Sequence, residues 1–208
     1  MKNMAGIILA FAACAMLLGA ADAPETQIIT RAGQKQMLAN PGTDPVGARQ
    51  PDVVIVEYFD YNCPYCKNMV PALQGLLARD PKVAVVYKDW PILSAVSKFA
   101  ATSALAAGYQ GKYLAAHDAL ISGPRLAQNA QVDAVLQGAG VNIETLNKDR
   151  AGHAKEIAAL LARNDQEAHA LTLQGTPGIV VGRQLVSGIV DLAQLHQLVA
   201  NSRKGLEK

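Results

Sequence analysis

Cys63 and Cys66 are separated by only two residues, Pro64 and Tyr65, and they closely follow an apolar run over residues 53–59. Such a run predicts a strand buried on both faces, and the cysteines should then stand at the start of the next helix. Two sulfurs three positions apart can close a disulfide there with little backbone movement. The first thiol faces unpaired N–H groups at the positive end of the helix dipole. Because this setting favours the thiolate, which is the form that attacks disulfides, the spacing indicates thiol–disulfide exchange.

Structural stapling and metal binding are two other roles that a cysteine pair can have. A disulfide across so short a loop restricts the unfolded chain little and stabilises the fold weakly. A zinc site needs about four ligands, and the sequence has no second paired ligand motif. We expect no metal site, and no cofactor other than a redox-active disulfide between Cys63 and Cys66. The histidines should be surface or helix-cap residues: His117, His153, His169 and His196.

The N-terminus has the three parts of a secretory signal peptide. Lys2 supplies the positive charge, residues 7–18 form the apolar core, and small residues at 19–23 offer a cleavage site. We expect residues 1–22 to be removed and the protein to act in the periplasm, where disulfides form. A faint lipoprotein-box pattern before Cys14 leaves a lipid anchor through this residue as the less favoured alternative.

Length and charge narrow the function classes further. The chain has 208 residues and a formal net charge of +2. Its lysines and arginines form no cluster, so the signature of nucleic-acid binding is missing. The length predicts one domain, or one domain that carries an insertion.

The region around the cysteines predicts a strand, a helix and a second strand. The strands cover residues 53–59 and 83–88, and the helix covers residues 63–79. A crossover of this kind places the two strands side by side and parallel. Before it, residues 24–50 are rich in turn-forming residues; they could hold a short helix over 26–38 and otherwise read as a strap or turn.

Residues 94–173 are rich in alanine and have leucines at helical spacing. Glycine-containing breaks separate five predicted helices, over residues 94–108, 111–121, 130–139, 143–150 and 153–173. Two short apolar strands should follow, over residues 178–182 and 184–187. A last helix over residues 191–201 should begin at Asp191, which is a good N-cap residue.

Three motifs in this order of elements resemble the thioredoxin superfamily and, within it, the exported DsbA-like proteins of the Com1-like branch. The motifs cover residues 57–66, 87–93 and 175–178. The resemblance implies an α/β protein with a thioredoxin fold and an inserted helical domain. The implied organisation is a signal peptide (1–22), an N-terminal extension (23–50), a thioredoxin-like domain (51–93 and 174–204) and the inserted helical domain (94–173).

The resemblance also implies separate roles for the residues of the cysteine motif. Cys63 would be the exposed nucleophile and Cys66 its buried partner, while Pro64 and Tyr65 would tune the reduction potential. Strongly oxidising DsbA proteins have a histidine where Tyr65 stands. A phenol cannot give imidazolium charge to the thiolate, so we expect a less acidic Cys63 and a weaker oxidant than in those enzymes.

Thr176 and Pro177 resemble the family's loop in which a cis proline lies beside the cysteine pair. A substrate peptide could then pair with the backbone of Thr176 by strand addition. An ordinary turn that opens a strand is the alternative for this Thr-Pro-Gly segment. Tyr61 and Tyr65 flank the first sulfur, and we expect them to form an apolar docking surface.

Glu57 and Lys88 are charged residues in two strands that are otherwise apolar. A buried carboxylate is costly unless it is paired, hydrogen-bonded or protonated. Our hypothesis is a partly buried Glu57–Lys88 pair beneath the disulfide, with Glu57 as the proton store for Cys66. The alternative is that both residues reach solvent from strand ends. We expect Asp60 and Asp89 to be solvated turn residues.

The function that these features favour is an exported oxidoreductase that forms disulfides in client proteins. Its partners would be clients with free cysteines or disulfides, and a membrane protein of the DsbB kind that re-oxidises the pair. One alternative is a periplasmic reductase or isomerase that a DsbD-like protein keeps reduced. An alternative from another class is a non-catalytic envelope binding or surface protein on the same scaffold. The sequence predicts no oligomeric state.

Overall fold

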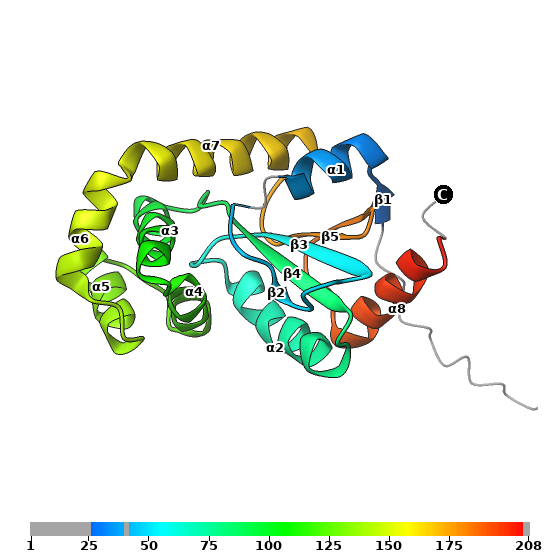
Figure 1. The fold of residues 1–208 in the computed structure, drawn as a ribbon, viewed down its shortest axis with the longest axis horizontal. Coiled ribbons are helices and arrows are strands. Elements are labelled where there is room, and N and C mark those ends of the chain that lie inside the picture. The colour runs from blue at the N-terminus through cyan, green and yellow to red at the C-terminus, as the bar shows by residue number, and fades with distance from the viewer. Residues whose placement is uncertain (1–25, 40–41, 206–208) are drawn as a thin grey trace, which may run out of the picture.

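The structure of the protein is a computed structural model that describes residues 26–39 and 42–205. The predicted signal peptide, its cleavage site and Cys14 lie outside the described residues. Figure 1 shows a central sheet between two layers of helices, with a block of further helices at one end. None of the described helices is both long and apolar enough to cross a bilayer.

The centre of the sheet is strand β3 (Val53–Phe59), which pairs in parallel with β4 (Val83–Asp89). The connection between them is helix α2 (Pro64–Arg79), so the predicted strand–helix–strand unit is confirmed. On its other side β3 pairs antiparallel with β5 (Gly178–Val181), and β5 pairs with β6 (Gln184–Ser187). The predicted α/β thioredoxin fold is therefore present around the cysteine motif.

The segment before β3 adds an edge strand to each side of the sheet. Strand β1 (Thr26–Ile28) pairs with β6, and strand β2 (Val46–Gly47) pairs with β4, which gives the order β1-β6-β5-β3-β4-β2. Helix α1 (Arg31–Ala39) lies between them. The short helix predicted over residues 26–38 therefore began too early and included the residues of β1, and β2 was predicted to be strap or turn.

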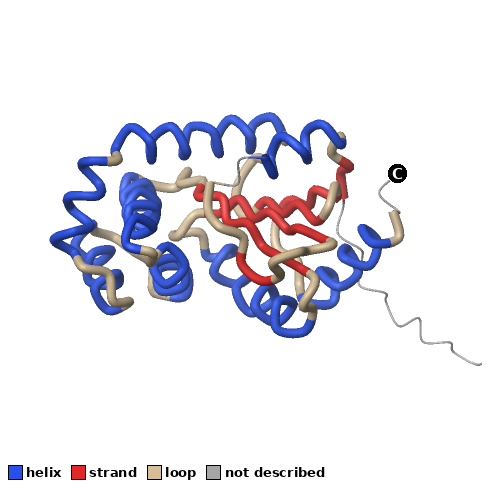
Figure 2. Tube along the Cα trace, viewed as in Figure 1, coloured by secondary structure: helices blue, strands red, loops and turns tan. Residues whose placement is uncertain are grey.

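The helical block is inserted between β4 and β5, and Figure 2 shows most of it beside the end of the sheet. The five helices predicted from the alanine-rich segment are confirmed: α3 (Ala95–Ala107), α4 (Tyr113–Ser122), α5 (Asn129–Gly138), α6 (Ile143–Gly152) and α7 (Ala154–Ala170). A 3-10 turn, η1 (Gly108–Gln110), joins the first two. The last helix of the block, α7, runs back along the sheet beside α1.

Alternation along β3 divides the core into two parts, one on each face of the sheet. Ile55 and Phe59 pack in the larger cluster with Cys63, Cys66 and the buried residues of α2 and α8 (Leu192–Arg203). Tyr58, between them in sequence, packs in the smaller cluster on the other face with residues of α1 and α7. The face on which a strand residue lies therefore decides whether it can influence the cysteines.

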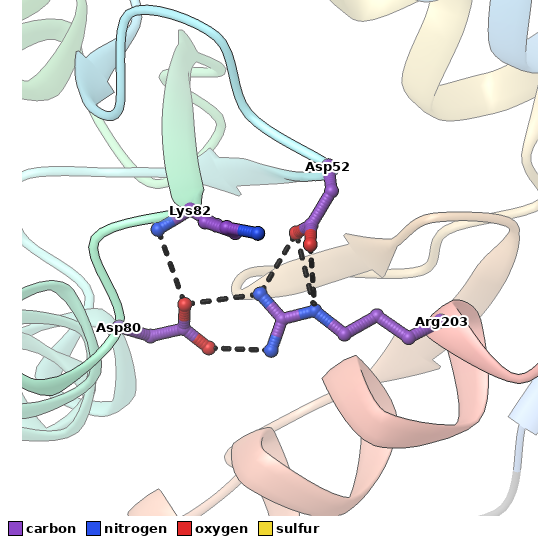
Figure 3. A network of polar contacts seen from close by, with 4 residues as sticks. All are labelled: Asp52, Asp80, Lys82 and Arg203. Atoms are coloured by element: carbon purple, nitrogen blue, oxygen red, sulfur yellow. Dashed lines mark hydrogen bonds and ion pairs between the residues drawn. The ribbon is translucent and has the colours of Figure 1, made fainter.

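Arg203, in the last turn of α8, links three elements at the end of α2 that is far from the cysteines. Its guanidinium donates hydrogen bonds to both carboxylate oxygens of Asp52, at 2.8 to 3.1 Å. It also donates to both carboxylate oxygens of Asp80, at 2.7 and 3.0 Å, and Figure 3 shows the network. The hydrogen bonds from Arg203 lower the pKa of Asp80. These bidentate contacts hold the start of β3, the end of α2 and the end of α8 together.

We expect Arg203→Met to lower the free energy of unfolding by about 1 kcal/mol at low salt, because it removes a partly exposed network of ion pairs. The loss should shrink at high salt, where the contribution of these charges is screened. Urea unfolding at two salt concentrations measures both effects. Lys204→Met is the matched control, since Lys204 is the exposed C-cap residue of α8 and directly follows Arg203. Equal stabilities for the two variants would contradict this account of the network.

Candidate active site

Cys63 is the N-cap residue of α2, with φ −74° and ψ 116°, and Pro64 follows in the first turn. The Cys63 carbonyl accepts the first helical hydrogen bond, from Lys67 N at 3.1 Å. Cys66 lies one turn further on and is fully buried, as expected. Cys63 itself is only 3% exposed, so its expected exposure is wrong. The exposed residues of the motif are Pro64 and Tyr65, which lie between the two sulfurs in sequence.

The Thr-Pro loop lies directly beside the first sulfur, although 113 residues separate them in sequence. Cys63 Sγ donates a hydrogen bond to the backbone oxygen of Thr176 at 3.2 Å. The peptide bond between Thr176 and Pro177 is cis. The Thr176 hydroxyl oxygen is buried and has no hydrogen-bond partner in the dithiol protein among the described residues. This hydroxyl is therefore available to a thiolate at Cys63.

The two thiols have opposite acidities. Hydrogen bonding by Cys66 lowers the pKa of Cys63 to about 6, with further lowering by Thr176 and by the Cys66 and Tyr65 backbone, against the effect of burial. Burial is the main cause that raises the pKa of Cys66, and its hydrogen bond to Cys63 and the charge of Glu57 add to it. At neutral pH Cys63 is the thiolate and Cys66 the thiol, which suits a nucleophile and its resolving partner.

Glu57 is buried on the same face of β3 as the cysteine cluster, with 3% of its surface exposed. Burial, and then the negative charge of Cys63, raise the pKa of this carboxyl to about 8. Its charge in turn raises the pKa of Cys66. Glu57 is therefore mostly protonated at neutral pH and is electrostatically coupled to both sulfurs.

Three exposed apolar side chains come from the first turn of α2 and from two loops that contact the segments around the cysteines. Tyr65 is 58% exposed, Leu93 52% and Ile189 45%. The Leu93 N–H donates to Asp60, three residues before Cys63, at 2.9 Å. Ile189 follows Gly188, whose N–H donates to the Pro177 oxygen at 2.9 Å. Apolar surface thus approaches the pair from three different segments.

Comparison with known proteins identifies the family. The model of the DSBA-like thioredoxin domain matches residues 54–200, which include both cysteines, the Thr-Pro loop and the helical block. The chain belongs to the DsbA-like thioredoxin family. The predicted resemblance is thereby confirmed.

Solved structures agree with this DsbA-like assignment. A thioredoxin-like oxidoreductase from Silicibacter pomeroyi DSS-3 is 39% identical, with a TM-score of 0.78, over 85% of this chain and 99% of that one. The thiol-disulfide exchange protein alpha-DsbA2 from Wolbachia pipientis is 25% identical, with a TM-score of 0.74, over 82% of this chain and 94% of that one.

The curated relatives that the DsbA-like chain matches are longer proteins. A Na(+)/H(+) antiporter NhaA 1 from Salinispora arenicola is 27% identical over 172 residues, which are 80% of this chain and 26% of the antiporter. The chain therefore spans about a quarter of the length of these relatives.

The buried Thr176 hydroxyl gives a direct test of how the DsbA-like site makes Cys63 acidic. Thr176→Val keeps the shape of the side chain and removes the hydroxyl whose hydrogen bond lowers the pKa of Cys63. We expect the pKa of Cys63 to rise by roughly half a unit, which ultraviolet absorbance of the thiolate measures. Thr145→Val makes the same change at an exposed position of α6 and should leave the titration unchanged. An unchanged titration in Thr176→Val would show that the hydroxyl has no such role.

The predicted Glu57–Lys88 pair is wrong, and so is the alternative that both residues reach solvent. The register pairs Glu57 with Tyr87 and Tyr58 with Lys88, so the two charges lie on opposite faces of the sheet. Lys88 is fully buried and donates to the carboxylate of Glu167, in α7, at 2.6 Å. The Tyr58 hydroxyl donates to the same carboxylate oxygen at 3.1 Å. Lys88 belongs to this second buried network and does not lie beneath the cysteines.

Tyr61 is not part of a docking surface, because it is 1% exposed. Its hydroxyl lies 3.3 Å from His117 Nδ1, on α4. His117 stacks on the ring of Tyr87 with centroids 4.0 Å apart, and burial lowers its pKa to about 3. The expectation that all four histidines lie at the surface or at caps is therefore wrong for His117. Tyr61 and His117 form part of the contact between the sheet and the helical block.

Asp60 and Asp89 are buried and are not the solvated turn residues expected from the sequence. The Asp60 carboxylate accepts from Asn62 N at 2.8 Å, and thereby shapes the turn that leads to the cysteines. Asp89 accepts from the Tyr113 hydroxyl at 2.8 Å, and burial raises the pKa of its carboxyl to about 7. Within the described part of the chain, no three metal-binding side chains come together.

Proposed function

We propose that the protein is an exported thiol–disulfide oxidoreductase that forms disulfides in client proteins through Cys63 and Cys66. The observation that carries this proposal is the opposite acidity of two neighbouring thiols, the first of which contacts Thr176. Membership of the DsbA-like family supports it, as do the oxidoreductase and thiol-disulfide exchange activities named for the two similar structures.

The reaction would start from the oxidised pair. A client thiolate attacks the sulfur of Cys63, a mixed disulfide forms, and the Cys63–Cys66 bond breaks. Cys66 leaves as a thiolate and takes up a proton, which protonated Glu57 can supply because its pKa of about 8 lies below that of Cys66. A second client thiolate then attacks the client sulfur of the mixed disulfide, and Cys63 leaves. The client gains one disulfide, and the pair accepts two electrons and becomes the dithiol.

The acidity of Cys63 supports the oxidising direction. A stable thiolate favours the reduced form of the pair and is a good leaving group, so the disulfide is a stronger oxidant. A pKa of about 6 lies between the values of about 7 for thioredoxin and about 3.5 for DsbA. This position agrees with the expectation that Tyr65, in place of histidine, gives a less acidic Cys63 and a weaker oxidant than in the strongly oxidising DsbA proteins.

Clients would bind as extended segments around a cysteine. The backbone of Thr176 offers polar groups for strand addition, and the exposed side chains of Tyr65, Leu93 and Ile189 offer apolar contacts. Re-oxidation would require a membrane partner of the DsbB kind. The signal-like N-terminus supports action in the periplasm.

Trapping the redox state of Cys63 and Cys66 in cells tests the proposal. Acid quenching followed by alkylation should find the pair mostly oxidised. A mostly reduced pair would favour the reductase or isomerase that a DsbD-like protein maintains. If the purified protein neither oxidises a dithiol peptide nor reduces insulin, it is a non-catalytic scaffold and the proposal fails.

A further inference from the structure

Lys67 directly follows the cysteine motif and contacts the end of α4 in the helical block. Its side chain is half-buried. The ammonium donates hydrogen bonds of 2.9, 3.2 and 2.9 Å to three backbone oxygens, those of Leu120, Ile121 and Gly123. An ammonium has three N–H donors, so all of them are used on this one helix end.

The end of α4 is a favourable place for a positive charge. The last carbonyls of a helix have no partner within it, and they form the negative end of the helix dipole. Helix α4 ends at Ser122, and its C-cap residue Gly123 is extended rather than left-handed. The usual glycine cap, in which backbone N–H groups satisfy these carbonyls, is therefore absent at this helix end, and Lys67 takes its place.

Asn62, on the other side of the cysteine motif, contacts the same segment. Its side-chain nitrogen donates to the Leu126 oxygen at 3.0 Å, and Leu126 N donates to its side-chain oxygen at 2.8 Å. Asn62 is buried. Residues 120–126 are thus bound by the residue before Cys63 and by the residue after Cys66.

The ammonium of Lys67, which this segment holds in place, interacts electrostatically with both cysteines. Lys67 lies one helical turn after Cys63, whose carbonyl accepts its backbone N–H. Burial lowers the pKa of Lys67, while attraction to the ionised forms of Cys66, Asp60 and Cys63 opposes that change. The same attraction favours the thiolate of Cys63, because an opposite charge stabilises an ionised group.

We propose that Lys67 is a positioning residue for exchange at Cys63. Its ammonium joins the active-site helix to the end of α4, and this contact keeps a positive charge beside the thiolate. The helical block thereby contributes to the acidity of Cys63, although Cys63 lies outside that block. The inference rests on the proposed function of the cysteine pair.

Titration of the dithiol protein tests this inference in four variants. Lys67→Met should raise the pKa of Cys63 by a few tenths of a unit, and Lys67→Gln should do the same while it keeps an amide donor for the carbonyls. Lys67→Arg keeps the charge and should retain the wild-type pKa. Lys98→Met removes an exposed lysine from α3 and should also retain it. Well below both pKa values, Lys67→Met should react about 1.5-fold more slowly with a peptide disulfide, since its thiolate is scarcer but more nucleophilic.

Asn62→Ala separates the effect of charge from general loosening of the contact. This variant should have a lower Tm than the wild type and an unchanged pKa of Cys63. The inference is wrong if Lys67→Met and Lys67→Gln titrate as the wild type does, or if Asn62→Ala shifts the pKa equally. An inactive wild-type protein would instead contradict the proposed function, and the titration would still decide the role of Lys67.

Discussion

Cys63→Ser is expected to lower the rate of thiol–disulfide exchange by at least about a thousandfold, because a serine hydroxyl is not ionised at neutral pH and forms no disulfide. The structure makes Cys63 the only described thiol with a lowered pKa. Reduction of insulin and oxidation of a dithiol peptide measure the loss in both directions. The folded state should remain, since serine fits the space and can donate to the Thr176 oxygen.

Cys66→Ser is the matched control, since it makes the same chemical change three residues further along α2. It leaves the Cys63 nucleophile in place and removes the thiol that would resolve the mixed disulfide formed when Cys63 attacks a client disulfide. This variant should therefore accumulate mixed disulfides with client peptides, visible on a non-reducing gel. Mixed disulfides that form through Cys66 in the Cys63→Ser protein would reverse the assigned roles.

Glu57→Gln is expected to stabilise the dithiol protein by on the order of 3 kcal/mol near pH 7. The pKa of Glu57 is raised from 4.5 to about 8, mainly by burial. Below about pH 4.5 the carboxyl is protonated in both states, so it costs the folded protein nothing. As the pH rises from there through about 8, the unfolded chain releases the proton more readily and the wild type loses stability. Glutamine does not titrate, so the variant escapes this loss.

Urea unfolding at several pH values measures the expected gain. The difference between Glu57→Gln and the wild type should be small near pH 4 and should grow up to about pH 8. Glu156→Gln, an exposed position on α7, should give no such gain. A pH-independent difference would mean that Glu57 is ionised in the folded protein. An unchanged pH dependence of peptide oxidation in Glu57→Gln would rule out Glu57 as the proton donor to Cys66.

Most of the elements could be predicted because each carries its pattern within a short stretch of sequence. The continuous apolar run of β3 and the helical spacing of the block are local signals. The edge strands β1 and β2 have three and two residues, too few for alternation to show. Their pairing depends on the edges offered by β6 and β4, which lie far away in the chain.

The wrong predictions about the site residues also arise because they depend on contacts between segments that lie far apart in the chain. Lys88 was assigned to the wrong face because a shift of one residue moves a side chain across the sheet. The register Val53 to Val83 places residue 87, not 88, beside Glu57. If side chains are assigned to alternate faces from the first residue of each predicted strand, Glu57 and Lys88 fall on opposite faces of the sheet. Tyr61 and Asp89 are buried by His117 and Tyr113 on α4, and no local pattern indicates which helix covers them.

The most direct test of the account is titration of the Cys63 thiolate in the dithiol protein, followed by its ultraviolet absorbance. We expect a single transition with a pKa of about 6, which is lost in Cys63→Ser and kept in Cys66→Ser. A pKa near 9, the ordinary value for a cysteine thiol, or a transition that survives in Cys63→Ser, would contradict the account.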